Sequence, residues 1–225
     1  MASGETVPET SVQGGKLSPS RGLVILIAAL YVLDQAAKWW IVLNFRPPIV
    51  FTDGFSMAAD RLPVITGGWG LLHLTITRVH NTGVAFGLGN GTAWSSYVFL
   101  AVPLLALAGL YALFRRGFFE TKLLRVSWAF ITAGILGNVT DRLVQGFFVK
   151  GSGTLSFWDR LMNGYVVDFI DVSLPWITSP DWPGGYHWPA FNVADSCICI
   201  AAAIFFIAGI ASDLSKKKKK TPPAP

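Results

Sequence analysis

Apolar and polar residues follow one another in long blocks along this chain, not in the short alternation of a soluble fold. Four apolar runs each reach the roughly 20 residues that a helix needs to cross a hydrocarbon layer of about 30 Å. They cover residues 22–43, 96–114, 123–144 and 190–214. The pattern therefore predicts one domain, residues 22–214, built on four transmembrane helices.

The segments between the runs carry weaker signals. Residues 72–79 (LHLTITRV) alternate apolar and polar side chains, which predicts a half-buried strand in a small sheet outside the bilayer. The loop at 145–189 is long and rich in Gly, Trp and Pro. Residues 1–21 are polar and expected to be a disordered extension, and residues 215–225 are expected to be a polybasic tail.

The composition supports a membrane protein. Hydrophobic residues make up 52% of the 225 residues and charged residues 14%, with a mean hydropathy of +0.49. The net charge of +5 comes largely from residues 216–220, five lysines directly after an apolar run. Such a run is more typical of a topology anchor on anionic lipid than of a nucleic-acid site. Cys197 and Cys199 lie two apart on a predicted helix, cannot easily pair, and are expected to be small core residues.

Lysine and arginine counts predict the orientation of the spans. Eleven basic residues fall on the side that holds both termini, and five fall in the two long loops on the other side. Because cytoplasmic flanks carry the excess of Lys and Arg, both termini are expected to be cytoplasmic.

Ionisable side chains inside a bilayer are costly and are functional hypotheses by default. Three spans carry such groups or amides at helical spacing: Asp34 and Lys38, then Asn138, Asp141 and Arg142, then Asn192 and Asp195. With the orientation above, all of them lie at the depth of the outer leaflet. Asp168 and Asp171 approach the same level from the loop before the last span.

Each of these groups also has a structural interpretation. Asp34 and Lys38, four residues apart on one helical face, are more typical of a structural ion pair than of a catalytic one. Asn138, Asp141 and Arg142 are as consistent with hydrogen bonds that tie helices together as with substrate positioning.

The structural interpretation is weakest for Asp168 and Asp195, because few cations are available at this depth to neutralise so many carboxylates. Asp171 is expected to face water. The chain contains no HExxH, GxSxG, P-loop or dinucleotide fingerprint, and its histidines show no metal-ligand spacing. Acid–base chemistry by paired carboxylates is the remaining hypothesis.

Five motifs carry a resemblance to a known family. They are DQAAK at 34–38, NTGVAFG at 81–87, GNVTDR at 137–142, VVDFI at 166–170 and FNVADS at 191–196. In this order, over four predicted spans, they resemble the bacterial lipoprotein signal peptidases, also called type II signal peptidases. The resemblance covers about residues 22–214.

The resemblance implies an all-α bundle of four transmembrane helices with a small extracytoplasmic β-cradle and a flap helix. It implies an aspartic endopeptidase of the bacterial inner membrane that removes signal peptides from prolipoproteins before a diacylglyceryl-modified cysteine. The catalytic dyad falls on Asp168 and Asp195. The candidate substrate-binding residues are Asp34, Lys38, Asn81, Asn138, Asp141, Arg142 and Asn192. No metal or cofactor is expected, and the partners are lipid-modified precursors and membrane lipid, with no nucleic acid and a monomeric enzyme.

The chain departs from the family pattern in its N-terminal extension and in longer segments at 145–165 and 171–190. The first longer segment contains a second Asp-Arg pair, Asp159 and Arg160. We favour Asp141 and Arg142 as the motif pair, because only there does Gly-Asn precede it.

Two functions of other classes remain as alternatives. A small proton-coupled transporter would also place carboxylates in the bilayer, but four spans without an internal repeat leave little room for alternating access. A non-catalytic membrane scaffold leaves the shared depth of the polar groups unexplained.

Overall fold

The computed structural model describes residues 18–50, 56–66, 72–83, 93–149, 151–178 and 185–220. Its long helices are α1 (Arg21–Asn44), α2 (Ala93–Arg115), α3 (Lys122–Val144) and α5 (Val193–Lys220). Each contains a stretch long and apolar enough to cross a membrane. The four predicted spans are therefore confirmed as helices. The last one begins three residues later than predicted and continues to Lys220, through residues assigned to a tail.

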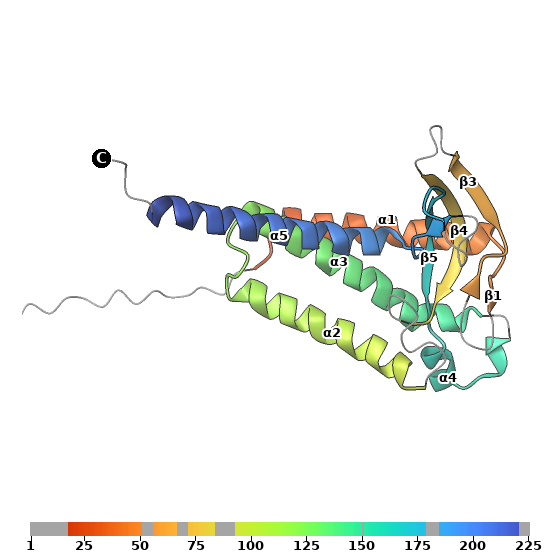
Figure 1. Cartoon of the computed structure of the whole chain (residues 1–225). Helices are drawn as coiled ribbons and strands as arrows, with labels where there is room; N and C mark the ends of the chain where they lie inside the picture. The colour runs from red at the N-terminus through yellow and green to blue at the C-terminus, as the bar shows by residue number, and fades with distance from the viewer. Residues whose placement is uncertain are drawn as a thin grey trace, which may run out of the picture.

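Three of the helices, α1, α3 and α5, run side by side, whereas α2 diverges from them towards the sheet (Figure 1). The helix α3 lies at the centre and packs against each of the other three. Close approach depends on Gly137, where an added Cβ would collide with the Asp34 carboxylate and crowd Ala194. A small residue at this position therefore lets α3 approach both α1 and α5.

A small antiparallel sheet closes one end of the bundle, in the order β3 (Arg61–Thr66), β4 (His73–Asn81), β5 (Val166–Leu174) and β6 (Tyr186–His187). A separate pair joins β1 (Ile49–Val50) to β2 (Ser56–Met57). The strand predicted at 72–79 is confirmed as β4. Asp168 lies in the segment before the last span, as predicted, and residues 166–174 of that segment form the strand β5 between β4 and β6.

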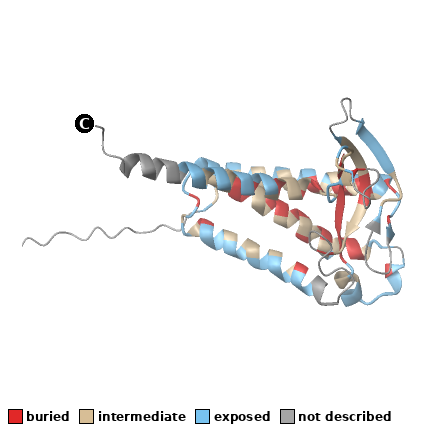
Figure 2. Cartoon of the chain, viewed as in Figure 1, coloured by how far each residue is buried: buried red, intermediate tan, exposed pale blue. Residues whose placement is uncertain are grey.

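The buried residues gather along α3 and in the sheet next to it, and the outer helical faces are exposed (Figure 2). A core of Ile41, Phe45, Tyr165, Val167 and Phe169 packs the end of α1 against β5. This core fixes the strand to the helix bundle without a long linker.

The chain runs from α3 to β5 through the 3-10 turns η2 (Gln145–Phe147) and η3 (Ser152–Thr154) and the short helix α4 (Phe157–Met162). These elements form the longer segment noted in the sequence.

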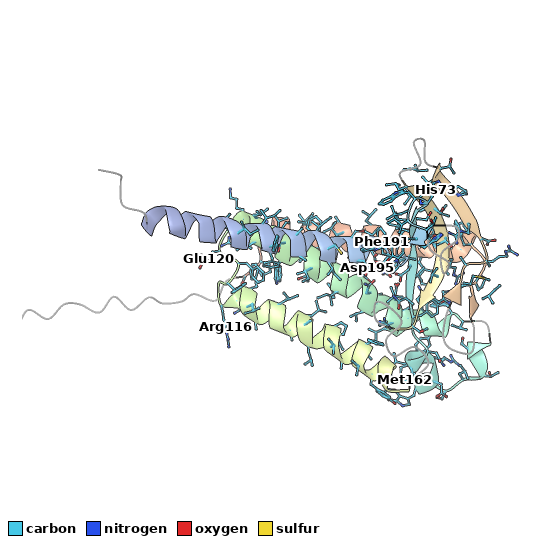
Figure 3. All side chains as sticks on the ribbon, in the orientation of Figure 1. His73, Arg116, Glu120, Met162, Phe191 and Asp195 are labelled. Atoms are coloured by element: carbon cyan, nitrogen blue, oxygen red, sulfur yellow. The ribbon has the colours of Figure 1, made fainter. Side chains whose placement is uncertain are left out.

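The helix bundle has two distinct ends, one closed by the sheet and one opposite it. The turn between α2 and α3, with Arg116 and Glu120, lies at the end opposite the sheet, whereas Phe191 and Asp195 lie near the sheet (Figure 3). The first residue of α1 and the last of α5 also lie at the end opposite the sheet (Figure 1).

The two cysteines have different surroundings. Both are free thiols, and Cys197 is buried as expected, but Cys199 is exposed. The prediction that both are core residues is wrong for Cys199, because residues two apart on a helix point to different sides and only one side of α5 faces the bundle.

Candidate active site

The first turn of α5 is closed by a reciprocal pair of hydrogen bonds between Asn192 and Asp195. The Asp195 backbone N–H donates to Asn192 Oδ1 (2.9 Å), and the Asn192 backbone N–H donates to Asp195 Oδ2 (3.1 Å). This is a capping box, in which a side chain at each end satisfies a free N–H of the helix start. The helix starts after Asn192 rather than at residue 190 because Phe191 pairs with Ile170 of β5.

Asp168 lies in the middle of β5 and is almost fully buried, with 2% exposure. Its carboxylate accepts hydrogen bonds from Asn192 Nδ2 (2.7 Å) and Asn81 Nδ2 (2.9 Å). Burial, and after it the negative charge of Asp195, raises the pKa of Asp168 above its usual range. This carboxyl group therefore retains a proton more readily than an exposed aspartate does.

Asn138 on α3 connects the two aspartates to the rest of the bundle. Its Nδ2 donates to Asp195 Oδ1 (2.8 Å), and its Oδ1 accepts from Lys38 Nζ (2.9 Å) and Asn192 Nδ2 (3.2 Å). Asn192 thus bonds to both Asp168 and Asp195, and one continuous hydrogen-bond network includes both carboxylates.

Behind this network lies a fully buried ion cluster. Lys38 Nζ lies 2.9 Å from Asp34 Oδ2 and 3.1 Å from Asp141 Oδ2, and all three residues are at most 1% exposed. The ion pair between Asp34 and Lys38 is confirmed. Buried charges are costly unless they are paired and hydrogen-bonded, and here they are both.

The two carboxylates of the cluster also accept backbone N–H groups. Asp141 Oδ2 accepts from Val167 N (3.0 Å), the residue before Asp168, and Asp34 Oδ1 accepts from Ala194 N (2.8 Å), the residue before Asp195. The ion cluster therefore fixes the backbone next to each of the two central aspartates.

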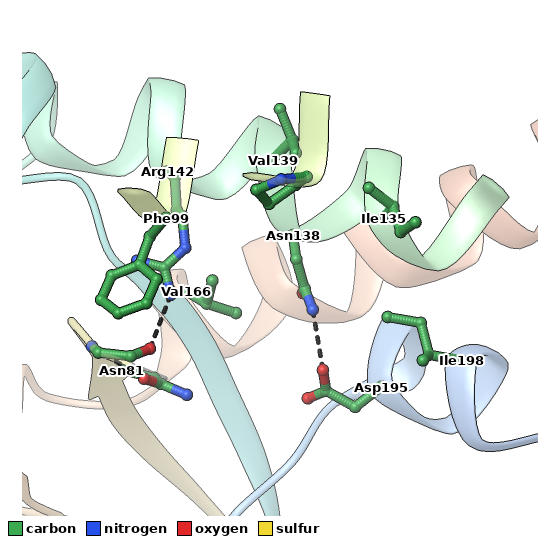
Figure 4. A pocket seen from close by; sticks show the side chains of 11 residues that line it. Asn81, Phe99, Ile135, Asn138, Val139, Arg142, Val166, Asp195 and Ile198 are labelled. Carbon is green, nitrogen blue, oxygen red and sulfur yellow. Dashed lines mark hydrogen bonds between the residues drawn. The ribbon is translucent and has the colours of Figure 1, made fainter. Parts of the chain in front are cut away.

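A pocket opens beside this network, between α2, α3 and α5 (Figure 4). Its lining residues are Asn81, Gly83, Phe99, Pro103, Ile135, Asn138, Val139, Arg142, Val166, Asp195 and Ile198. Its walls are thus mostly apolar, and the polar groups gather at the sheet end.

Arg142 is one of the polar groups in this lining. Its Nη2 donates to the Gly83 carbonyl (2.9 Å), and its guanidinium lies 5.0 Å from the centre of the Phe99 ring. The side chain therefore connects α3 to the segment after β4 and to α2.

Asn81, the last residue of β4, lines the pocket. Arg78, two strand positions before His80, donates from Nη1 to the Val42 and Phe45 carbonyls (3.0 Å each), which ties β4 to the end of α1. His80 stacks on Tyr165 with 3.7 Å between ring centres. Burial lowers the pKa of His80 to about 3, so its ring is neutral at physiological pH.

The structure brings all the sequence-predicted site residues into one region, where they form three groups. Asn81, Asn138, Arg142 and Asp195 line the pocket. Asp168 and Asn192 bond directly to these residues, and Asp34, Lys38 and Asp141 form the buried cluster behind them. The motif at 81–87 is described only as far as Gly83, and the rest of it lies outside the described residues.

Asp171 was expected to face water, and this prediction is wrong. Its side chain is 9% exposed, forms an ion pair with Arg61 of β3, and lies 2.9 Å from His187 Nδ1 of β6. The sheet order places β6 directly beside β5 and β3 one strand beyond β4, so Asp171 has a partner on each side, and the local sequence gives no sign of this.

The second Asp-Arg pair lies apart from the pocket. Asp159 is on α4. Its Oδ2 accepts from Ser156 Oγ (2.7 Å), and its backbone N–H donates to Ser156 Oγ (3.1 Å). This is a local helix cap, which agrees with the choice of Asp141 and Arg142 as the motif pair.

Two residues at the site were not singled out from the sequence. Gln35 donates from Nε2 to Asp34, Asp141 and the Gly137 carbonyl at 3.1–3.2 Å. Its place beside Asp34 in the first motif could have indicated it. Phe99 contacts Arg142 from α2, and no pattern in an apolar span distinguishes it from its neighbours.

Comparison with known proteins gives one consistent result. The family model described as "Signal peptidase (SPase) II" matches residues 26–211. A lipoprotein signal peptidase of Vibrio cholerae is 34% identical over 202 residues, which is 87% of this chain and 96% of that protein. The one from Alteromonas mediterranea is 32% identical over 85% of this chain and 83% of that protein. A solved structure described as a bacterial membrane enzyme has a TM-score of 0.59 at 23% identity, covering 91% of this chain and 94% of the other.

Proposed function

The chain belongs to the signal peptidase II family, and from that premise we propose that it is an aspartic endopeptidase that removes signal peptides from prolipoproteins. The cleaved bond precedes a diacylglyceryl-modified cysteine. The observation that carries the proposal is the hydrogen-bond network in which Asn192 joins Asp168 to Asp195 beside the pocket. The comparisons give no support to the transporter alternative, because the curated relatives are lipoprotein signal peptidases.

Hydrolysis of an amide requires a base that activates water and an acid that polarises the carbonyl. Two nearby carboxylates that share one proton supply both roles. Asp168, the more deeply buried and with a raised pKa, holds the proton and polarises the carbonyl. Asp195, which lines the pocket, is ionised, takes a proton from water as the hydroxide adds to the carbonyl carbon, and gives this proton to the amine nitrogen as the C–N bond breaks.

Asn81, Asn138 and Asn192 position the dyad. Each donates an amide N–H to one of the two carboxylates, and an amide cannot itself take up the proton that the mechanism moves. Arg142 holds the segment after β4 through the Gly83 carbonyl and thereby shapes the polar end of the pocket.

Asp34, Lys38 and Asp141 were predicted to bind substrate, and we propose a positioning role for them instead. All three are fully buried and their charges are used within the cluster. They affect the reaction indirectly, because Asp141 and Asp34 hold the backbone N–H groups of Val167 and Ala194 next to the dyad.

The apolar walls of the pocket fit a lipid-modified substrate. Phe99, Pro103, Ile135, Val139 and Ile198 come from three spans, so the substrate meets the dyad at membrane depth. The signal peptide and the lipid on the cysteine would remain in the bilayer while the scissile bond reaches the polar end.

We further propose that both termini are cytoplasmic and that the site faces the outer leaflet of the bacterial inner membrane. The charge count supports this orientation, because eleven basic residues fall on the side of the termini and five on the other. In this arrangement, the sheet of β3–β6 is the extracytoplasmic cradle. The flap helix, the disordered extension at residues 1–21 and the monomeric state remain predictions.

The proposal is tested with the purified protein in detergent and a synthetic precursor peptide, followed by mass spectrometry. The peptide with a diacylglyceryl cysteine should be cut before that cysteine, and the same peptide with an unmodified cysteine should not. Cleavage should persist in EDTA, because carboxylates bind the water directly. Loss of activity in EDTA with recovery on added zinc would contradict the aspartic mechanism.

A further inference from the structure

The segment between α3 and β5 presents large apolar side chains at its surface. Phe148, Phe157 and Trp158 are 61%, 62% and 67% exposed, and Leu155 is also exposed. We call these four residues the α4 surface. Aromatic side chains of this size are usually buried in a soluble region, so their exposure requires a partner.

The position of the α4 surface along the bundle is fixed by backbone packing. The third span extends to Phe147, so the segment starts where the apolar helix ends. An added Cβ at Gly164 would collide with the Arg142 carbonyl, and one at Gly146 would collide with the Arg160 carbonyl. These contacts hold α4 against the end of α3, at the level where α2 begins (Figure 1).

The two charged side chains of α4 bond to other groups of the same segment. Arg160 donates from Nε to the Leu155 carbonyl (3.1 Å) and from Nη2 to the Gly153 carbonyl (2.9 Å), and Asp159 bonds to Ser156. The charges therefore stabilise the turn, and the aromatic side chains form the outward face.

The α4 surface is continuous with the lipid-facing side of α1. Trp39 packs edge-on against Phe148 with 5.0 Å between ring centres. Beyond it, Trp40 and Leu43 near the same end of α1 are 49% and 78% exposed. A spanning helix exposes such residues to lipid, so the apolar surface extends from the bilayer onto the α4 segment.

We propose that the α4 surface inserts into the boundary between headgroups and acyl chains at the site end of the membrane. Tryptophan is suited to this boundary because its apolar ring meets lipid while its N–H meets headgroups, and phenylalanine and leucine form the apolar face of helices that lie there. Because Gly164 contacts the backbone of Arg142 and leads into β5, the insertion fixes the depth of the pocket in the bilayer. This consequence for the pocket rests on the proposed function, whereas lipid contact does not.

The test uses site-directed spin labels on the full chain with Cys197→Ala and Cys199→Ala. The variants Phe157→Cys and Trp158→Cys report on the α4 surface. Gly153→Cys is the matched control, because Gly153 is exposed in the same segment and an added Cβ there meets open space. Each labelled protein is placed in nanodiscs of phosphatidylethanolamine and phosphatidylglycerol, and power saturation is measured with oxygen and with a water-soluble nickel chelate.

Labels at 157 and 158 should collide with oxygen more often than with the nickel chelate, and the label at 153 should show the reverse ratio. Equal nickel accessibility at 158 and 153 would overturn the proposal, because the surface would then face water. Protection of 158 from both reagents would also overturn it, because protein would then cover the surface. Precursor cleavage is measured separately, so its absence with lipid contact intact would count against the proposed function alone.

Discussion

At the scale of single residues, the site depends on backbone N–H groups that are held by buried charges. Val167 and Ala194 each precede one of the proposed catalytic aspartates and donate to the carboxylates of Asp141 and Asp34. Lys38 forms an ion pair with each of these carboxylates. The charge of one lysine therefore controls the position of two separate chain segments.

Replacing that lysine gives the first prediction. Lys38→Met should destabilise the protein by about 3–5 kcal/mol, because it leaves two buried carboxylates without their cation. The thermal midpoint in detergent measures the loss, and precursor cleavage should fall with it. Arg46→Ala is the control, since Arg46 forms an exposed ion pair with Asp60 and should leave the midpoint unchanged.

A triple variant distinguishes the effect of unpaired charges from the effect of the changed side-chain shape. Combining Lys38→Met with Asp34→Asn and Asp141→Asn removes all three charges and should recover much of the lost stability. A triple variant as unstable as Lys38→Met would show that the unpaired carboxylates are not the cause.

The second prediction separates the two roles of Asn192. Asn192→Ser keeps a cap for the Asp195 N–H, whereas Asn192→Ala removes it at a cost of about 1 kcal/mol. Both variants lose the amide that donates to Asp168. Cleavage should therefore fall at least about tenfold in both, while Asn192→Ala lowers the thermal midpoint further than Asn192→Ser does. Wild-type cleavage by Asn192→Ser would show that this amide is dispensable.

The polar residues of the site could be found from the sequence because ionisable groups in apolar spans are rare and expensive. This reasoning identified Asp34, Lys38, Asp141 and Asp195, which the structure places in one network. It failed for Asp171, whose partners come from strands that no local pattern connects to it.

At the scale of elements, the spans were predictable because each is stabilised by its own apolar composition in lipid. The strand β5 was not, because it is held by pairing with β4 and by packing against the end of α1. The start of α5 was misplaced for a similar reason: the pairing of Phe191 with Ile170 keeps the preceding residues out of the helix. Long-range pairing is the information that an apolar run lacks.

The third prediction concerns the junction between α3 and α4. Gly164→Ala should cost about 1–3 kcal/mol through overpacking, because its Cβ has no room beside the Arg142 carbonyl. The displacement of Arg142 should also reduce cleavage. Gly153→Ala, in open space of the same segment, should change neither the thermal midpoint nor cleavage. Equal behaviour of the two variants would contradict this packing argument.

At the scale of the whole molecule, all the proposed chemistry lies at one end of the bundle. The sheet and the dyad lie at that end, and the first residue of α1, the last of α5 and the turn between α2 and α3 lie at the other (Figures 1 and 3). A membrane protein with this separation exposes its site on one side only.

The fourth prediction tests which side that is. In a background with Cys197→Ala and Cys199→Ala, Ser3→Cys and Pro222→Cys should be shielded from an impermeant thiol reagent in intact cells. Gly153→Cys should be labelled. Labelling of either terminal position in intact cells, with shielding of position 153, would reverse the orientation that the basic residues predict.

The paired action of Asp168 and Asp195 is tested most directly by cleavage of the lipid-modified precursor by Asp168→Asn and Asp195→Asn. Each purified variant should retain its thermal transition yet lose at least about a hundredfold in kcat, because an amide can neither take up nor supply the proton. Asp159→Asn, in the Asp-Arg pair on α4, should cleave as the wild type does. Near-wild-type cleavage by either dyad variant would contradict the aspartic mechanism.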